Sequence, residues 1–301
     1  MLATANRQEN LVIELALLAL LAGLWGSSYL LIKVAVVGIP PVTLIAIRVS
    51  LAALLLLAIL RLQNAQLPKD SQTRRLLLVQ ALLGSVVPWT LLAWGQQYID
   101  SGLAGVLNST SPIFVFLITL LVTRHEAVTP WKLAGALLGV VGVALIMGVD
   151  VLRGLGQQVA GQAAVLLSAF LFALAAIHGK HFSSIPPTVT AAGAMVWSSV
   201  CLIPLSLAVD QPWMLQPSAL SIAAAITLGI FNTGVAMLIY FRLVHTLGSM
   251  GVSSQSYLRM GVSVLLGVVV LGEQVTPAIG LGLAAIVLGV LAINLRPRRA
   301  A

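Results

Sequence analysis

The sequence predicts an all-α polytopic membrane protein of ten transmembrane helices, arranged as two inverted five-helix repeats. The first observation is composition: 59% of the 301 residues are hydrophobic, 8% are charged, and the mean hydropathy is +1.06. A soluble domain carries about 25% charged residues. The second is a series of apolar segments of about 20 residues, the length that crosses a hydrocarbon layer of roughly 30 Å. The third is an internal match that relates the two halves.

Ten apolar segments follow one another along the chain, separated by short polar or proline-containing turns such as 38–41 and 185–187. They are too long for strands and lack two-residue alternation, and in lipid each backbone polar group needs a partner within a helix or a closed barrel. We interpret the first segment as a span because it is too long for the apolar region of a signal peptide. The predicted spans cover residues 11–36, 41–62, 75–98, 102–123, 129–149, 158–180, 187–209, 218–243, 249–271 and 276–295.

Positive charge sets the predicted orientation. The formal charge of +8 comes from 16 Lys and Arg against 8 Asp and Glu, and it is spread over loops, which argues against a nucleic-acid partner. With the amino terminus inside, one side collects Arg7, Arg61, Lys69, Arg74, Arg75, Arg124, Lys132, Lys180, Arg242, Arg296, Arg298 and Arg299. The other side has Arg153, with Lys33 near its edge. Since cytoplasmic loops retain positive charge, we expect a multi-pass protein of a bacterial inner (plasma) membrane with both termini cytoplasmic.

The two halves match at an offset of 147 residues. The run Glu126-Ala-Val-Thr-Pro130 reappears as Glu273-Gln-Val-Thr-Pro277, and Lys33 falls on Lys180. Five residues after the first run recur after the second: Gly135, Val140, Gly142, Val143 and Ile146 correspond to Gly282, Val287, Gly289, Val290 and Ile293. We therefore predict repeats at 1–150 and 151–301. Five spans per repeat is an odd number, so the second copy is inverted, and inverted repeats place a solute site at their interface.

Several motifs carry a family resemblance over nearly the whole chain. They are Trp25-Gly26-Ser27-Ser28 with Lys33, Pro40-Pro41 and Arg48; Ser101-Gly102-Leu103-Ala104; Asn108-Ser109-Thr110-Ser111-Pro112; Glu126 to Pro130 with Gly135 and Gly142; and Tyr240, Gly248, Glu273, Thr276-Pro277 and Gly282. These residues resemble EamA-type transporters of the drug/metabolite transporter superfamily, and within it the amino-acid and aromatic amino-acid exporter branch. Relatives often carry proline in the ninth span at the position equivalent to Pro112, where this chain has Arg259.

The resemblance implies a basket in which spans 1, 3, 4, 6, 8 and 9 surround a cavity while spans 5 and 10 serve as scaffold. It also implies a secondary transporter that exports small metabolites, above all amino acids including aromatic and other neutral ones, by alternating access. A multidrug or other metabolite carrier is the alternative, and a passive channel is a further one, although no repeated polar ring is present. An enzyme is not expected, because the chain has no His-Glu-x-x-His pair and no Gly-x-Ser-x-Gly turn.

Arg259 is the charge placed furthest inside a predicted span. A central arginine costs roughly 2.5 to 3.5 kcal/mol on insertion scales and usually faces a cavity or a partner. Gln255, Arg259 and Ser263 share one helical face, with Ser256 and Tyr257 nearby. We expect the guanidinium to receive a substrate carboxylate or to hold a gate, and a structural ion pair or carbonyl contact is the alternative. Arg48 and Lys33 are weaker candidates because both lie nearer a membrane surface.

Other polar and aromatic side chains interrupt apolar spans and are candidates for lining the cavity. Pro88, Pro112 and Lys33 are candidate kink or gating residues, since proline frees a carbonyl and bends a helix. An interfacial aromatic belt, ordinary packing, a structural kink and a satisfied histidine at a helix end are the alternatives. The remaining candidates are Trp25, Tyr29, Trp89, Gln96, Asn108, Ser109, Ser111, His178, Asn232 and Tyr240.

No Asp or Glu lies in the middle of a predicted span, so the driving force stays open between proton coupling and downhill export. Glu126 and Glu273 begin spans 5 and 10, where we expect helix caps rather than proton carriers. Glycines 135, 139 and 142 favour close helix packing, either internal or in a weak homodimer, so we expect a monomer or a weak homodimer. Cys201 is alone, and neither a metal nor a cofactor is expected. The expected partners are a small solute and the lipid bilayer.

Overall fold

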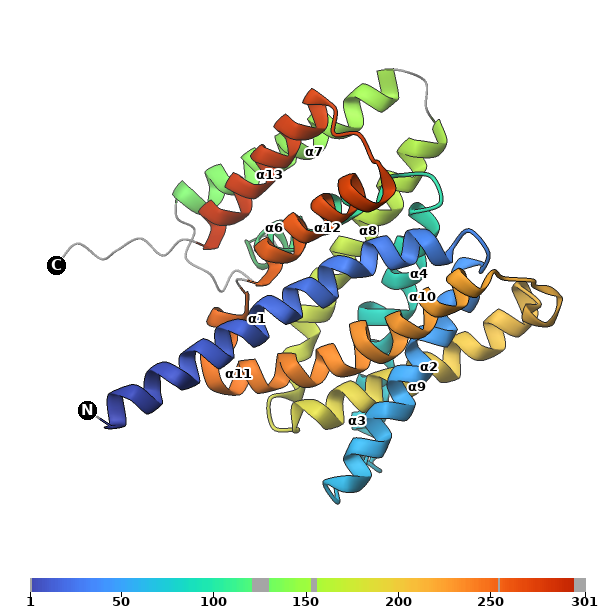
Figure 1. Ribbon diagram of the computed structural model, residues 1–301, viewed down its shortest axis with the longest axis vertical. Helices are drawn as coiled ribbons and strands as arrows, with labels where there is room; N and C mark the ends of the chain where they lie inside the picture. Colours follow the sequence, from blue (N-terminus) through green and yellow to red (C-terminus); the bar gives the residue numbers. More distant parts are fainter. Residues whose placement is uncertain (1, 121–129, 153–155, 254, 295–301) are drawn as a thin grey trace.

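The computed structural model describes residues 2–120, 130–152, 156–253 and 255–294, and every regular element in these ranges is helical (Figure 1). The first half contains α1 Leu2–Ala35, α2 Pro41–Leu62, α3 Ser71–Ala81, the π-helical turn η1 Leu82–Val86, α4 Val87–Gly95, α5 Ser101–Asn108, α6 Ser111–Ile118 and α7 Pro130–Leu152. The all-α prediction is confirmed.

The second half repeats this order of elements. It contains α8 Gly156–His178, the 3-10 turn η3 Gly179–Phe182, α9 Pro187–Val209, the 3-10 turn η4 Pro212–Met214, α10 Ala219–Gly229, the π-helical turn η5 Ile230–Val235, α11 Ala236–Ser253, α12 Gln255–Leu271 and α13 Pro277–Asn294. Three spans are composite, because α3, η1 and α4 form one, α5 and α6 another, and α10, η5 and α11 a third.

Seven helical segments of the described chain are long and apolar enough to cross a membrane. Three further apolar helices are shorter, Leu133–Ile146, Leu258–Leu271 and Ile279–Ala292. These segments correspond to the ten predicted spans. The span Ala219–Leu243 agrees with the predicted 218–243, and the helix α11 continues beyond it to Ser253.

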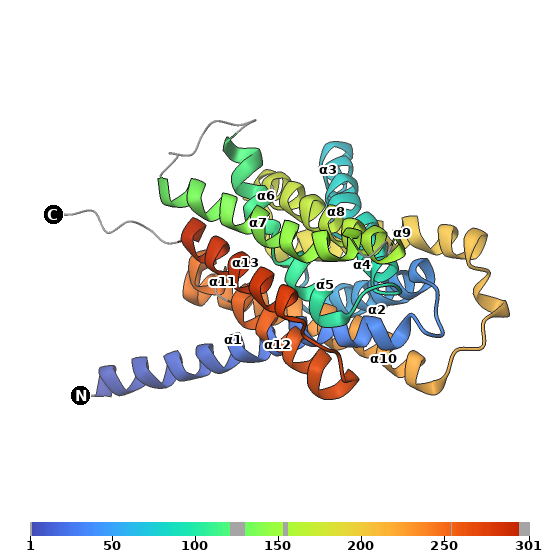
Figure 2. The same ribbon diagram turned by 90° about the horizontal axis from the view of Figure 1, so that it is seen from above.

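The two halves run in opposite directions. In Figure 1, α1 runs away from the end of the molecule where the chain starts, whereas α8 runs toward that end. The antiparallel pair of α7 and α13 lies side by side in both views (Figures 1 and 2). A Cβ added to Gly142 would lie 2.7 Å from the carbonyl oxygen of Gly282, and one added to Gly289 would lie 2.5 Å from that of Gly135. The glycine stripe of span 5 therefore packs inside the molecule, against span 10.

The two π-helical turns occupy corresponding positions in the repeats. Adding 147 to the bounds of η1 gives 229–233, and η5 covers Ile230–Val235. Pro88 lies two residues after the end of η1 and has no N–H to bond the preceding turn, which accounts for the wider turn there. The hydroxyl of Thr90 donates to the carbonyl of Val86 at 2.6 Å, and that of Thr233 donates to the carbonyl of Leu228 at 2.8 Å. Each hydroxyl thus occupies a carbonyl near the widened turn.

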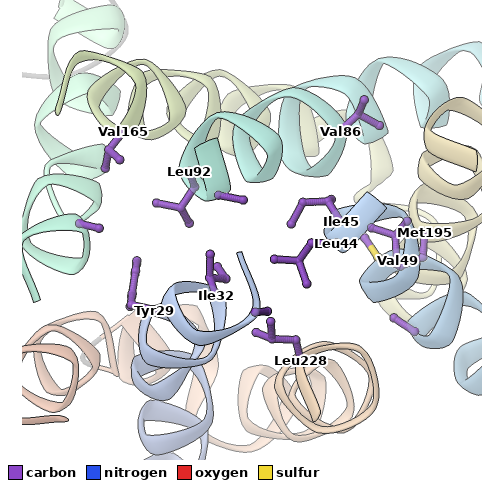
Figure 3. Packing of buried hydrophobic residues seen from close by; sticks show 14 of the residues in the cluster. Tyr29, Ile32, Leu44, Ile45, Val49, Val86, Leu92, Val165, Met195 and Leu228 are labelled. Atoms are coloured by element: carbon purple, nitrogen blue, oxygen red, sulfur yellow. The ribbon is translucent and has the colours of Figure 1, made fainter. Parts of the chain in front are cut away.

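A buried apolar cluster fills the interior at the end of the molecule where α1 ends and α2 begins. The side chains of Ile32, Leu44, Ile45 and Leu92 point toward one another between α1, α2 and α4 (Figure 3). Ile32, Leu44 and Ile45 are fully buried. Their packing excludes water from this end and forms the floor of the space described next.

Candidate functional site

A cavity of about 690 Å³ lies between the two halves, a volume within the usual range of small-molecule sites. Nine of the residues that sequence analysis singled out line it: Trp25, Tyr29, Trp89, Asn108, Ser111, Asn232, Tyr240, Gln255 and Arg259. Spans 2 and 7 line it as well, through Arg48 on α2 and through Thr190, Ala194 and Met195 on α9. The cavity wall therefore includes two helices that the family resemblance did not assign to it.

The lining residues show which end of the molecule the cavity faces. The segment between α8 and α9 contributes Gly179, Phe182, Ser183 and Ile185. Among the described residues that line the cavity, none comes from the loops at the opposite end, 36–40, 96–100, 210–218 and 272–276. We call the first end the mouth and the second end the sealed end.

Arg48 is the buried cation of the cavity. Its side chain is 4% exposed, its Nε donates to the hydroxyl of Thr233 at 2.8 Å, and its guanidinium carbon lies 4.0 Å from the centre of the Trp89 ring. The stacking and the hydrogen bond come from opposite halves of the chain, because Trp89 lies on α4 and Thr233 lies in η5. Both partners are neutral, so they orient the guanidinium without cancelling its charge.

A hydrogen-bonded group connects α1 to both halves beside the cavity. The amide nitrogen of Asn108 donates to the hydroxyl of Tyr29 at 2.8 Å, while the amide oxygen of Asn108 is buried without a hydrogen-bond partner. Asn232 donates to the hydroxyls of Ser27 and Ser28 at 3.0 and 3.2 Å. Asn232 therefore ties η5 to α1, whereas Asn108 keeps an acceptor in the cavity wall.

Arg259 lines the cavity in a partly exposed position on α12, and its Nε is buried without a hydrogen-bond partner. Gln255 lies one turn before it and also lines the cavity. Ser263 does not: it is 1% exposed and packs against Gly105 of α5. The side chains of Ser256 and Tyr257 lie outside the described residues.

Five other predicted candidates lie outside the cavity wall. Ser109 is buried and donates to the carbonyl of its own helix at Gly105, 2.8 Å away. Pro112 is the second residue of α6, after the break that follows Asn108, and Pro88 is buried in the first turn of α4. Gln96 is fully buried at the sealed end, and His178 contacts the carbonyl of Leu76 at 3.1 Å. Helical periodicity could not separate these packing positions from cavity positions, because each is a polar residue or a proline within an otherwise apolar helix.

Lys33 and Glu273 hold the sealed end together. The amine of Lys33 donates to the carbonyls of Gln96 and Ile99, both at 2.8 Å. The carboxylate of Glu273 accepts from the backbone N–H groups of Ser101 and Gly102 at 2.6 and 2.8 Å. Glu273 is therefore a helix cap, but it caps α5 of the other repeat rather than its own α13. Its repeat counterpart, Glu126, lies outside the described residues.

Asp100 precedes α5 at the sealed end and has no cap hydrogen bond from its side chain. Partial burial, which favours the neutral acid, raises the pKa of Asp100 above its ordinary value of 3.8. The negative charge of Glu273 raises this pKa further, and the positive charge of Lys33 opposes the rise. The folded protein therefore binds a proton at Asp100 more readily than a free aspartate does.

Two helix pairs related by the repeat differ in how they touch. At the sealed end, a Cβ added to Gly95 of α4 would lie 2.7 Å from the carbonyl oxygen of Gly161 on α8, so the two backbones are in contact. The repeat offset of 147 relates Gly161 to Glu14 on α1 and Gly95 to Arg242 on α11. Glu14 and Arg242 lie at the mouth end. There the contact is an ion pair of 3.1 Å, and the hydroxyl of Thr246 also donates to Glu14 at 2.9 Å.

Within the described residues, no group of three or more His, Cys, Asp or Glu side chains is placed to hold a metal ion. The charged groups among the described residues that line the cavity are Arg48 and Arg259. Guanidinium groups beside aromatic rings suit an organic anion with a planar or apolar body. The cavity is therefore equipped to bind such an anion.

Comparison with known proteins agrees with this architecture. The sequence matches the EamA-like transporter family twice, over residues 13–148 and 159–295. The chain belongs to the EamA-like transporter family. Each match covers one half of the chain, as two copies of the same five-helix unit require, and the family places the protein in the drug/metabolite transporter superfamily. It is a family of transporters rather than a class of enzymes.

Individual relatives of this EamA-like protein are distant but span most of its length. The uncharacterized inner membrane transporter YedA of Escherichia coli strain K12 is 26% identical over 272 residues, 90% of this chain and 87% of YedA. The uncharacterized transporter YoaV of Bacillus subtilis strain 168 is 24% identical over 268 residues, 89% and 91% of the two chains. A crystal structure with a TM-score of 0.64 and 20% identity covers 92% of this chain and 96% of its own, and shows the same fold.

Sequence reasoning underrated Arg48 and missed Thr233. Arg48 was placed below Arg259 because only seven residues separate it from the start of its span. The structure shows that the cavity reaches to this depth. The signal that could have raised its rank was available: an arginine within an apolar span that its side chain cannot leave needs a cavity or a polar partner.

Proposed function

We propose that this EamA-like protein is a secondary transporter that exports small carboxylate-bearing metabolites by alternating access. Amino acids, including aromatic and other neutral ones, are the class that the sequence predicts. One observation carries the proposal: a cavity lies between inverted repeats, faces one end of the protein, is sealed at the other, and contains Arg48 with an unneutralised charge. A pathway closed at one end is what a carrier requires and what an open pore lacks.

The direction of export follows from the predicted orientation. The mouth lies at the end where the first residues of α1 and the last turn of α13 are found (Figure 1). The predicted distribution of Lys and Arg assigns this end to the cytoplasm, and YedA is named an inner membrane transporter. We therefore propose an inner-membrane location with both termini cytoplasmic, so that the mouth receives solute from the cell.

The lining residues support a division of roles. Arg48 and Arg259 offer forks of N–H donors to a substrate carboxylate. Trp25 and Tyr240 stack with ring centres 5.4 Å apart and offer an apolar wall for an aromatic or aliphatic side chain. The amide oxygen of Asn108 is a buried acceptor without a hydrogen-bond partner in the cavity wall. Together they fit a small solute with one acidic head and an apolar body.

An efflux panel in proteoliposomes tests this function. Vesicles loaded with radiolabelled phenylalanine, leucine or a carboxylate-free amine are diluted, and loss of label is followed with and without an imposed pH gradient. We expect saturable efflux of carboxylates that Arg48→Met and Arg259→Gln variants reduce. Efflux of cationic amines alone would favour a multidrug carrier, and non-saturable flux of all solutes would favour a channel. If Arg259→Gln, inserted normally, keeps its rate and affinity, the substrate role of Arg259 is wrong.

A further inference from the structure

The charge of Arg48 has no acidic counterpart in the cavity. Its Nε–H is used by Thr233, and its flat face rests on Trp89, so the two amino groups of the fork remain for a ligand. Among the described residues no carboxylate is ion-paired with Arg48, and none lines the cavity. A buried charge that lacks a counter-charge is costly in a medium of low dielectric constant, and an incoming anion relieves that cost.

Arg259 adds a second positive charge to the same cavity. Arg48 lies on α2 and Arg259 on α12, and both line the cavity wall. Two positive charges in the wall of one cavity draw anions inward.

The repeat indicates that neither arginine is required by the fold. The positions related to them by the 147-residue offset are Met195 for Arg48 and Pro112 for Arg259. Met195 lies on α9 with 2% exposure and lines the same cavity, so an apolar side chain serves the equivalent position. The positive charges are therefore a property of the cavity rather than of helix packing.

From these observations we infer that the cavity selects solutes of net negative charge: it binds an organic carboxylate more tightly than the zwitterion of the same skeleton. Among the described residues that line the cavity, an ammonium group meets neutral acceptors, such as the unpartnered amide oxygens of Asn108 and Gln80, and no carboxylate, and both guanidinium groups repel it. An acid that lacks the ammonium avoids this repulsion while keeping the carboxylate contact and the aromatic wall. The inference rests on the proposed function and names the substrate class of the same site.

A matched set of three ligands tests the charge preference. Phenyllactate and phenylalanine differ by a hydroxyl in place of the ammonium, and phenylethylamine lacks the carboxylate. Binding is measured by isothermal titration calorimetry on the purified protein in lipid nanodiscs at pH 7. We expect phenyllactate to bind at least tenfold more tightly than phenylalanine, with phenylethylamine weakest, and the affinity for phenyllactate to fall as salt is raised.

Variants identify the group responsible. Arg48→Met installs the side chain that the other repeat carries, and it should lower phenyllactate affinity at least tenfold and remove the preference over phenylalanine. Arg48→Lys keeps the charge without the fork, and it should keep the preference with weaker binding. Arg61→Gln, at the exposed end of the same helix, is the matched control and should leave both affinities unchanged. If Arg48→Met does not fold, the same comparison is made with Arg48→Lys and Arg259→Gln.

The outcomes separate the two claims. Equal or tighter binding of phenylalanine by the wild-type protein overturns the charge preference and leaves carboxylate transport standing. Unchanged phenyllactate affinity in Arg48→Met overturns the role of Arg48. Failure of both carboxylates to bind, with or without binding of phenylethylamine, overturns the proposed function together with the inference.

Discussion

The guanidinium of Arg242 on α11 pairs with the carboxylate of Glu14 on α1 at 3.1 Å, and the two positions related to this pair by the repeat are both glycine. Gly95 and Gly161 bring α4 and α8 into backbone contact at the sealed end. At the mouth end the repeat-related pair, α1 and α11, is joined through long side chains instead. The two repeat-related contacts thus differ: the glycine contact brings the helix backbones together at the sealed end, and the ion pair holds them further apart at the mouth end.

Removing one partner of this ion pair should cost more than removing both. Glu14 is 8% exposed, so Arg242→Gln leaves a nearly buried carboxylate that must lose its charge or its packing. Arg242 is more than half exposed, which keeps the worth of the intact pair to about 1 kcal/mol or less. We expect Arg242→Gln to lower thermal stability and the double variant Glu14→Gln with Arg242→Gln to restore most of it. Additive losses in the double-mutant cycle would show that the pair contributes nothing.

The cap from Glu273 should govern how firmly the sealed end stays closed. Glu273→Ala removes the acceptor for the N–H groups of Ser101 and Gly102, a loss of about 1 to 2 kcal/mol for a helix cap. We expect a wider distance distribution between spin labels at Gln97 and Gln274 in a Cys201→Ser background, measured by double electron–electron resonance. Val37→Ala, an exposed change at the same end, serves as the control. An unaltered distribution in Glu273→Ala would remove the cap from the account of closure.

Lower pH should stabilise the folded protein through Asp100. Its pKa is raised by burial and by the carboxylate of Glu273, so the folded chain binds a proton at this group more tightly than the unfolded chain does. The sign follows: stability from this group is fully present below the ordinary pKa of 3.8 and is lost as pH rises through the raised value. The unfolding temperature should therefore gain a contribution on acidification toward pH 4 that Asp100→Asn removes. The same pH dependence in Asp100→Asn and in the wild-type protein would contradict this contribution.

The hydroxyl of Thr233 orients Arg48 in the cavity wall. Thr233→Val keeps the shape of the side chain but leaves the Nε–H of Arg48 without its acceptor. We expect phenyllactate affinity to fall about three- to tenfold, equivalent to about 1 kcal/mol, while Thr233→Ser stays close to wild type. Rescue by serine separates the lost hydroxyl from a packing defect. A threefold loss in Thr233→Ser as well would point to packing.

The contact between α7 and α13 should tolerate no added methyl group at Gly142. The Cβ of Gly142→Ala would lie 2.7 Å from the backbone oxygen of Gly282, so the helices must separate, at about 1 to 3 kcal/mol. Gly23→Ala is the matched control, because nothing lies within 4 Å of its added Cβ and alanine favours the helix. Thermal unfolding in detergent compares the two variants. Equal stability of Gly142→Ala and Gly23→Ala would contradict the internal scaffold.

The sequence was sufficient for the ten spans and the inverted repeat, because hydropathy over 20 residues and a fixed offset are strong signals. It was weaker where neighbours from the other half decide the outcome. Gln96 and Asn108 are both polar residues in apolar spans, yet Gln96 packs at the sealed end and Asn108 lines the cavity. Glu273 caps a helix 172 residues away from it, a pairing that no local pattern indicates.

Counterflow in proteoliposomes tests the central claim most directly, that one cavity faces one side of the membrane at a time. Vesicles are loaded with a high concentration of unlabelled phenyllactate and placed in a trace of labelled phenyllactate outside. A carrier exchanges one for the other, so label should accumulate transiently above its equilibrium level, and Arg48→Met should abolish this overshoot. Label that rises only to equilibrium, at a rate unaffected by the internal solute, would contradict alternating access.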